Sequence, residues 1–260
     1  MAAAATEPIP GRVNQDWCCV TPSAAVVLDG VTPRGETGCV HDVPWYVSRL
    51  GAALVSRLGA ALPLADTLAG AIADTARAHE GACDLSQPGS PAAAVAVLRW
   101  HGDVVEYLAL ADVTVVLHGA DGLQVITDDR VAATEPVPAG AVGTAGHTAG
   151  VEAMMYAQLT SRNRPGGYWV ASSSPAAAAE AITGTASGST TAAALTDGAA
   201  AVVDRYGLMT WTRALAVLTE RGPAELIRRA RTAERADPDG TLWPRLKTAD
   251  DATAVIMTRD

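Results

Sequence analysis

The stretch VVLDGVTP, residues 26–33, leads a short apolar run into an Asp-Gly pair. An apolar run that stops at Asp-Gly is typical of a strand followed by a turn. A single aspartate at such a place usually bonds its own backbone. The meaning of Asp29 therefore depends on whether other aspartates occupy the same kind of place.

Four further aspartates do. Asp112 ends LALAD, Asp197 ends AAALTD, and Asp250 with Asp251 opens the run ATAVIM. If these strand ends converge at one edge of a sandwich, the crowded carboxylates raise one another's pKa unless a cation lies between them. Mg²⁺ and Mn²⁺ prefer carboxylate and water oxygens. Taken singly, each aspartate is a turn residue. Together they indicate a divalent-metal site only if their order along the chain has a meaning of its own.

The composition limits the classes of function. With 260 residues and 49% hydrophobic side chains the chain can bury a real core. A net charge of −9 without a basic stripe argues against nucleic-acid binding. No apolar run approaches the roughly 18 residues of a membrane span, and the N-terminal residues lack a signal-peptide pattern. We expect a cytoplasmic protein with one domain over residues 1–260 and no membrane or nucleic-acid partner.

The four cysteines, of which Cys18 and Cys19 are adjacent, follow neither a zinc spacing nor a secreted disulfide framework. We expect them to be reduced and partly buried.

Periodicity predicts the order of the elements. After an irregular start, strands 16–20 and 24–28 form a hairpin, and a helix over 43–62 carries a stripe of Tyr46, Leu50, Leu54, Leu58 and Leu62. The remaining expected elements are a helix 65–79, an antiparallel meander over 91–127, a helix 151–159, a strand 162–172, a short helix 174–183, a loop 184–190, a strand 190–198, helices 199–206, 208–219 and 223–234, and a final strand 250–260. This order predicts the α+β class, as an αββα four-layer sandwich of two antiparallel sheets flanked by helices.

The aspartates and their surroundings resemble the metal-dependent protein phosphatases, the type 2C serine/threonine phosphatase family, in a divergent, bacterial-type form. Six stretches in family order carry the resemblance, from about residue 11 to 258. They are Asn14-Gln15-Asp16, VLDG at 27–30, SPAAAVAVL at 90–98, LADVTVVL at 110–117, LTDG at 195–198 and DDATAVIM at 250–257.

The resemblance implies a centre of two Mg²⁺ or Mn²⁺ ions and hydrolysis by metal-activated water without a phosphoenzyme. Asp29 would bridge both metals, and the Gly30 carbonyl would bind one. Asp197 and Asp250 would complete the second metal's ligands, and Asp112 matches an auxiliary ligand of a third. Asp16 would hold metal-bound water as a catalytic residue.

The chain also departs from the family pattern. Val31-Thr32-Pro33 replaces the usual glycines after Asp-Gly, Gln15 replaces Glu, and Val113 follows Asp112 where the family has Ser. The phosphate-binding arginine is shifted by one place to Arg12, which the resemblance implies as a catalytic residue.

Other residues admit two interpretations. His41 is either a proton donor or a histidine at a helix start next to the capping Asp42. Arg162 and Arg164 either hold a phosphate or are solvated.

The leading hypothesis is a metal-dependent phosphatase of phosphoserine or phosphothreonine in proteins, with a small phosphorylated metabolite as a variant substrate. The alternatives are a weak or inactive pseudophosphatase that binds a partner, and an unrelated αβ domain whose aspartates do not converge.

Overall fold

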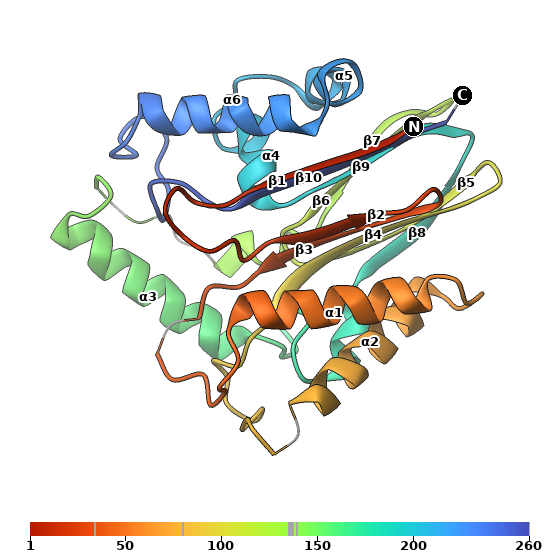
Figure 1. The fold of residues 1–260 in the computed structure, drawn as a ribbon. Coiled ribbons are helices and arrows are strands. Elements are labelled where there is room, and N and C mark those ends of the chain that lie inside the picture. The colour runs from red at the N-terminus through yellow and green to blue at the C-terminus, as the bar shows by residue number, and fades with distance from the viewer. Residues whose placement is uncertain (34, 80, 135–137, 139, 260) are drawn as a thin grey trace.

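The computed structural model describes residues 1–33, 35–79, 81–134, 138 and 140–259. Its strands form two antiparallel five-stranded sheets, which lie face to face (Figure 1). Sheet A has the strand order β1 (Ala2–Glu7), β10 (Ala252–Thr258), β9 (Ser189–Leu195), β6 (Thr114–Gly119) and β7 (Gly122–Thr127). Sheet B has the order β2 (Trp17–Val20), β3 (Ala24–Gly30), β4 (Ala93–His101), β5 (Val104–Leu110) and β8 (Ile182–Ser187).

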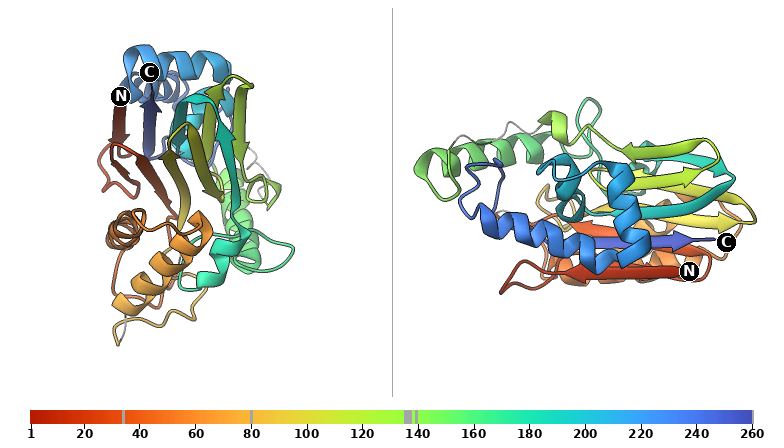
Figure 2. Two further views of the ribbon diagram at one scale, coloured as in Figure 1. Left: turned by 90° about the vertical axis from the view of Figure 1, so that its right-hand side faces the viewer. Right: turned by 90° about the horizontal axis from the view of Figure 1, so that it is seen from above.

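Helices cover both outer faces, so the predicted αββα sandwich is confirmed (Figures 1 and 2). Sheet B packs against α1 (Val43–Arg57) and α2 (Leu64–Ala78). Sheet A packs against α4 (Asp197–Asp204), α5 (Trp211–Arg221) and α6 (Pro223–Ala236). The remaining helices are α3 (Ala145–Ser161) and the 3₁₀ segments η1 (Ala132–Thr134) and η2 (Pro175–Glu180). Among the described residues, no helix combines the length and apolar character needed to cross a bilayer.

Strand β3 shows why the central strands are apolar throughout. Ala25 and Val27 face the core between the sheets, whereas Val26 and Leu28 face α1 and α2. Both faces of the strand are buried, so polar residues cannot alternate with apolar ones. Burial of each such large side chain stabilises the fold by about 1.5–3 kcal/mol. The apolar run that precedes Asp29 is thus held rigidly on both sides.

Helix α1 forms on the predicted apolar stripe but ends early. The Asp42 side chain accepts a hydrogen bond from Trp45 N at 2.9 Å, which caps its first turn. Tyr46 and Leu50 are buried along its inner face. The helix ends at Arg57 rather than 62, because Gly59 is a poor helix former and Pro63 cannot continue the backbone hydrogen bonds. Leu62 is consequently 48% exposed.

Two stretches expected to lack strands contain them. The irregular start is strand β1, paired antiparallel with β10 from Ala2↔Met257 to Glu7↔Ala252. Its run of alanines lacks the β-branched residues that mark a strand in sequence. The expected loop 184–190 is divided between β8 and β9, with a turn at Gly188, whose φ is 64°.

The expected strand 162–172 is not a strand. Only the isolated bridges Arg162↔Tyr168 and Ala93↔Ala171 occur there. Gly166 has a φ of 80°, and a Cβ on Gly167 would lie 1.9 Å from the Ser161 carbonyl oxygen. The glycines thus serve a tight turn after α3 rather than a ladder.

The expected meander over 91–127 is two hairpins in different sheets. β4 pairs with β5 in sheet B, and β6 pairs with β7 in sheet A. The chain crosses between the sheets over residues 111–113, where Ala111 takes a φ of 65°. This conformation costs a non-glycine residue on the order of 1 kcal/mol or more. The crossing places Asp112 at the end of both sheets.

We expect Gly51→Ala and Gly70→Ala to have opposite effects on stability. A Cβ on Gly51 would lie 2.5 Å from the Trp17 ring, whereas at Gly70 it would meet only the end of the flexible Arg57 side chain at 3.1 Å. Gly51→Ala should lower the free energy of unfolding by about 1–3 kcal/mol through overpacking. Gly70→Ala should be neutral or raise it by up to about 1 kcal/mol. Urea unfolding of both variants measures this, and equal stabilisation by both would contradict the packing of α1 on β2.

Candidate functional site

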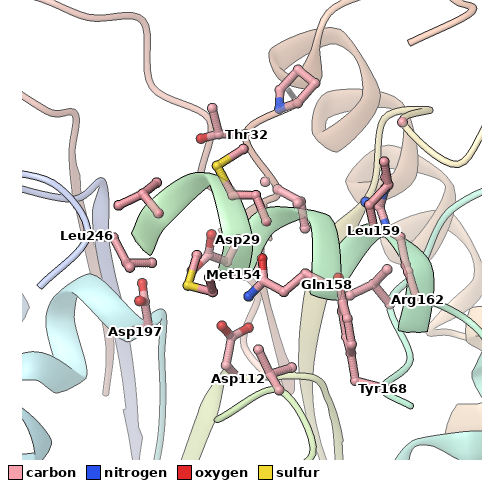
Figure 3. A pocket seen from close by; sticks show the side chains of 18 of the residues that line it. Asp29, Thr32, Asp112, Met154, Gln158, Leu159, Arg162, Tyr168, Asp197 and Leu246 are labelled. Atoms are coloured by element: carbon pink, nitrogen blue, oxygen red, sulfur yellow. The ribbon is translucent and has the colours of Figure 1, made fainter. Parts of the chain in front are cut away.

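Carboxylates from four separate chain segments border one cavity of about 340 Å³ beside α3. Figure 3 shows Asp29, Asp112 and Asp197 around this cavity, with Met154 and Gln158 of α3 alongside. The predicted metal ligands Asp29, Gly30, Asp112, Asp197 and Asp250 all line it. The strand ends do converge, as the sequence pattern requires.

Asp29 lies in the penultimate position of β3, opposite Ala94 on β4. Burial raises its pKa well above the usual value, and the charges of Asp16 and Asp197 raise it further. Position 30, directly after Asp29, has room only for glycine. An added Cβ would lie 2.3 Å from the Gln15 carbonyl oxygen and 2.3 Å from Val43 Cγ1. The Asp-Gly pair therefore combines a carboxylate with a backbone that comes close to its neighbours.

Asp197 and Asp250 approach the cavity from sheet A. Asp197 is the first residue of α4, and Asp250 comes shortly before β10. A Cβ on Gly198 would lie 2.0 Å from the Asp251 carbonyl oxygen, so the second Asp-Gly pair also serves a close backbone approach. Burial, followed by the charge of Asp197, raises the pKa of Asp250 to about 6.

Two cations lie beside these carboxylates. Lys247 Nζ is 2.5 Å from Asp250 Oδ1, and Arg205 Nη2 is 3.6 Å from Asp197 Oδ2. Burial alone would lower the pKa of Lys247, but the charge of Asp250 raises it above its usual value. These cations offset only part of the negative charge, since the pKa of Asp250 is still raised.

Asp16 lies behind the cavity rather than in its wall. It is 6% exposed, and Thr196 Oγ1 donates to its Oδ2 at 3.0 Å. Its Oδ1 is buried with no hydrogen-bond partner among the described residues. Burial raises its pKa well above the usual value. A buried carboxylate oxygen without a hydrogen bond lowers the stability of the folded state unless a ligand or a water binds to it.

Asp251 has a different role from its neighbour Asp250. Its two oxygens accept hydrogen bonds from Ile9 N at 2.7 Å and Gln15 N at 2.8 Å. It therefore ties the segment before β2 to the start of β10. The Gln15 side chain also accepts a hydrogen bond from Thr32 Oγ1 at 2.6 Å. The bond links Gln15 to the Val31-Thr32-Pro33 stretch, and both differ from the motifs that the sequence resembles.

The three candidate arginines differ in their relation to the cavity. Arg12 is exposed and does not line the cavity, and Arg164 is exposed as well. Arg162 does line the cavity. Its Nη1 donates to Pro88 O at 2.8 Å, its Nε is buried without a partner among the described residues, and burial lowers its pKa. Figure 3 shows Arg162 across the cavity from Asp197.

Helix α3 gives the cavity an apolar wall, which the sequence had not indicated. It presents Val151, Met154, Met155 and Leu159, together with the polar Gln158. This helix buries few side chains, so its sequence has only a weak helical pattern of apolar residues. The sequence therefore predicts a helix only over 151–159, whereas α3 spans Ala145–Ser161.

The expectation that all four cysteines are reduced is wrong for two of them. Cys39 and Cys83 are paired as a disulfide, so they are not reduced in this structure. Cys18 and Cys19 are free and half-buried, as expected. Cys39 and Cys83 are separated by 44 positions, and nothing in the sequence indicates their proximity. His41, the other residue left open, stacks on Trp45 with the ring centroids 3.7 Å apart.

The donor set at the cavity fits hard divalent cations. It consists of the carboxylates of Asp29, Asp112, Asp197 and Asp250, and burial and mutual repulsion raise the pKa of Asp29 and Asp250. The buried Asp16 oxygen without a partner lies behind them. Among the described residues, the carboxylates do not form a group of three with all ligand atoms within 4.8 Å of one another. A hydrated Mg²⁺ ion keeps several waters and binds through one or two carboxylates, so it does not require such a close group.

We expect Asp29→Asn to stabilise the protein in EDTA at neutral pH. Folding raises the pKa of the Asp29 carboxyl, so the ionised carboxylate destabilises the folded state at a pH above the raised pKa. This loss of stability disappears as the pH falls toward 3.8, the pKa of an unperturbed aspartate, because the carboxyl is then protonated. The difference in stability between the variant and the wild type should therefore shrink as pH falls from 7 to 4.

Thermal unfolding at a series of pH values measures this difference. The matched control is Asp121→Asn, because Asp121-Gly122 is an exposed turn after β6 that accepts Asn-Gly equally well. A lower stability of Asp29→Asn than of Asp121→Asn in EDTA at pH 7 would contradict the crowding of carboxylates.

No protein-family model and no curated protein matches the chain. Among solved structures, the chain is similar to the PPM Ser-Thr phosphatase MsPP from Mycobacterium smegmatis in complex with cacodylate, with 17% sequence identity and a TM-score of 0.57. The match includes 100% of this chain and 98% of the MsPP chain. It is also similar to the serine/threonine phosphatase PstP/Ppp from Mycobacterium tuberculosis, with 15% identity and a TM-score of 0.59. That match includes 98% of this chain and 97% of the PstP/Ppp chain.

The catalytic domain of the serine threonine protein phosphatase PstP in complex with 2 manganese ions is 14% identical, with a TM-score of 0.55, and covers 98% of this chain and 96% of that one. These likenesses extend over nearly the whole of both chains while identity is low, so they establish the fold. The chain has the fold of the PPM serine/threonine phosphatases.

Proposed function

We propose that the protein is a metal-dependent phosphomonoester hydrolase that acts on phosphoserine or phosphothreonine in proteins. One observation carries the proposal: carboxylates from four chain segments and the side chain of Arg162 line the same cavity, in the fold of the PPM phosphatases. Residues 1–260 would form one catalytic domain, acting in the cytoplasm.

Asp29, the Gly30 carbonyl, Asp197 and Asp250 would hold two Mg²⁺ or Mn²⁺ ions, and Asp112 would add a ligand for a third. Support comes from their shared cavity and from the manganese-bound structure that has this fold. When bound, the ions supply an activated water and offset the charge of the phosphoryl oxygens. Asp16, with an oxygen that has no partner, would accept a hydrogen bond from water behind the site.

Arg162 would bind the substrate phosphate. Its guanidinium lies in the cavity wall, it pairs with no carboxylate among the described residues, and its Nε lacks a partner. Carbonyl oxygens of Pro88 and Ser90 hold the side chain through Nη1, at 2.8 Å and 3.3 Å. A partly desolvated arginine held in this way is suited to an oxyanion. Arg12, the family-based candidate, is exposed away from the cavity.

The apolar wall of α3 favours a protein substrate over a small phosphorylated metabolite. Met154, Met155 and Leu159 border the same cavity as the carboxylates. A phosphorylated residue would place its phosphate among the charged groups while its neighbours contact methionines, which adapt to varied surfaces. The alternative, an inactive pseudophosphatase, rests on the altered Val31-Thr32-Pro33 stretch, which lines the cavity as well.

The first test is hydrolysis of p-nitrophenyl phosphate with Mn²⁺, Mg²⁺ or EDTA. We expect turnover with either metal and none in EDTA. Asp29→Asn should reduce turnover by at least about 100-fold, in line with the loss of several kcal/mol of charge stabilisation. It should also remove the Mn²⁺-induced rise in Tm.

Asp121→Asn, which alters an Asp-Gly pair far from the cavity lining, should change neither property. Mn²⁺ binding without hydrolysis of this ester or of a phosphopeptide would favour the pseudophosphatase. Full metal-induced stabilisation of Asp29→Asn would show that the ions bind elsewhere.

Arg162→Lys should lower kcat/KM for a phosphopeptide by about 10- to 100-fold, since a charge-assisted hydrogen bond contributes about 1.5–3 kcal/mol. The effect should appear mainly in KM if the guanidinium binds the ground-state phosphate. The matched control is Arg164→Lys, two residues further along and exposed. Equal kinetics for both variants would remove Arg162 from phosphate binding.

A further inference from the structure

Beside the carboxylate cavity, two chain segments meet, joined by hydrogen bonds and by a pair of cysteines. Residues 35–42 precede α1, and residues 81–92 precede β4. Asp84 N donates to Gly38 O at 2.7 Å, and Ser90 Oγ donates to Thr37 O at 3.4 Å. Each segment carries one cysteine, Cys39 in the first and Cys83 in the second.

His79, at the end of α2, faces both sulfurs. Its Nδ1 is 3.2 Å from Cys39 Sγ and 3.4 Å from Cys83 Sγ. The imidazole is only 2% exposed, and the cysteines are half-buried. In the part of the chain that the structure describes, this is the one group of three His, Cys, Asp or Glu residues with all ligand atoms within 4.8 Å.

The two nitrogen-to-sulfur distances are close to those of a tetrahedral metal site, whereas the two sulfurs are bonded here and would separate on reduction. With Zn–S near 2.3 Å and Zn–N near 2.0–2.1 Å, the edge between a sulfur and a nitrogen ligand is about 3.6 Å. The observed 3.2 Å and 3.4 Å lie within a few tenths of an ångström of that edge. A disulfide by itself needs no imidazole nitrogen directed at both of its sulfurs.

Two neighbours add to the site. The backbone N–H of His41 donates to Cys39 Sγ at 3.3 Å, and such a bond favours a thiolate. The His41 ring lies 5.3 Å from the His79 ring between centroids. It is not part of the close group of three and stacks on Trp45, so a water would fill the fourth ligand position.

We propose that Cys39, His79 and Cys83 bind one Zn²⁺ ion when the cysteines are reduced, and that the Cys39–Cys83 disulfide is the oxidised form of the same site. A dithiol reductant supplies two electrons and two protons to the disulfide, which gives two thiols and leaves the reductant as its own disulfide. Zn²⁺ then displaces two protons as the thiolates bind it.

The site would brace one wall of the cavity in either state. Thr32 and Pro33 line the cavity shortly before Cys39, and Gly89 and Ser90 line it shortly after Cys83. Sulfur and imidazole ligands select Zn²⁺, whereas the carboxylates select Mg²⁺ or Mn²⁺. The two sites can therefore hold different metals at the same time, and this one does not depend on the proposed phosphatase activity.

Cobalt titration tests the proposal. The full chain is reduced with a phosphine, stripped of metal and titrated with Co²⁺ as a probe. Thiolate ligands give strong charge-transfer absorption in the near ultraviolet, and Co²⁺ bound only by oxygen does not. We expect this absorption to saturate at one equivalent, to disappear when one equivalent of Zn²⁺ is added, and to be absent from the oxidised protein.

Variants assign the ligands. Cys83→Ser and His79→Gln should weaken Zn²⁺ affinity by at least about 10-fold, as expected for loss of a ligand. Cys18→Ser is the matched control, because burial raises the pKa of Cys18 to about 11 and disfavours its thiolate. Asp29→Asn should keep the absorption, which separates this site from the carboxylates. Reduced wild-type protein without the absorption, or absorption lost in Cys18→Ser but kept in Cys83→Ser, would overturn the proposal.

Discussion

The carboxylate repulsion at one end of the sandwich is the interaction on which the site depends. Asp29, Asp197 and Asp250 are brought together by strands whose positions are fixed by burial on both faces, so the carboxylates cannot separate. Packing of the two sheets and their helices supplies the free energy that offsets this repulsion. The same crowding that destabilises the fold would be relieved by the divalent cations that we propose for this cavity.

Much of this could be predicted from the sequence. The aspartates that follow continuous apolar runs predicted carboxylates converging on one place, because a buried strand ends where such a run meets a polar turn. The layer order followed from the alternation of strand groups and helix groups. Asp16 also lies near the cluster, and its charge is one of those that raise the pKa of Asp29.

Other features could not be predicted because they depend on contacts between distant residues. Strand β1 forms on a run of alanines because β10 supplies its partner backbone, which no local propensity reveals. The pairing of Cys39 with Cys83 and their approach to His79 depend on how two segments pack. Arg162 reaches the cavity because a turn at glycines, and not a strand, follows α3.

The cavity is bounded by parts of the molecule that differ in how firmly they are held. Its carboxylates belong to strands and strand ends in the buried sheets, whereas α3 buries only His147, Val151 and Met154 along its 17 residues. Local opening of a segment with few buried contacts costs much less free energy than global unfolding. Fluctuations of α3 can therefore alter the width of the cavity on a faster timescale than any change among the carboxylates. The volume available to a ligand is thus a time-averaged property, while the positions of the carboxylates that the ligand meets change little.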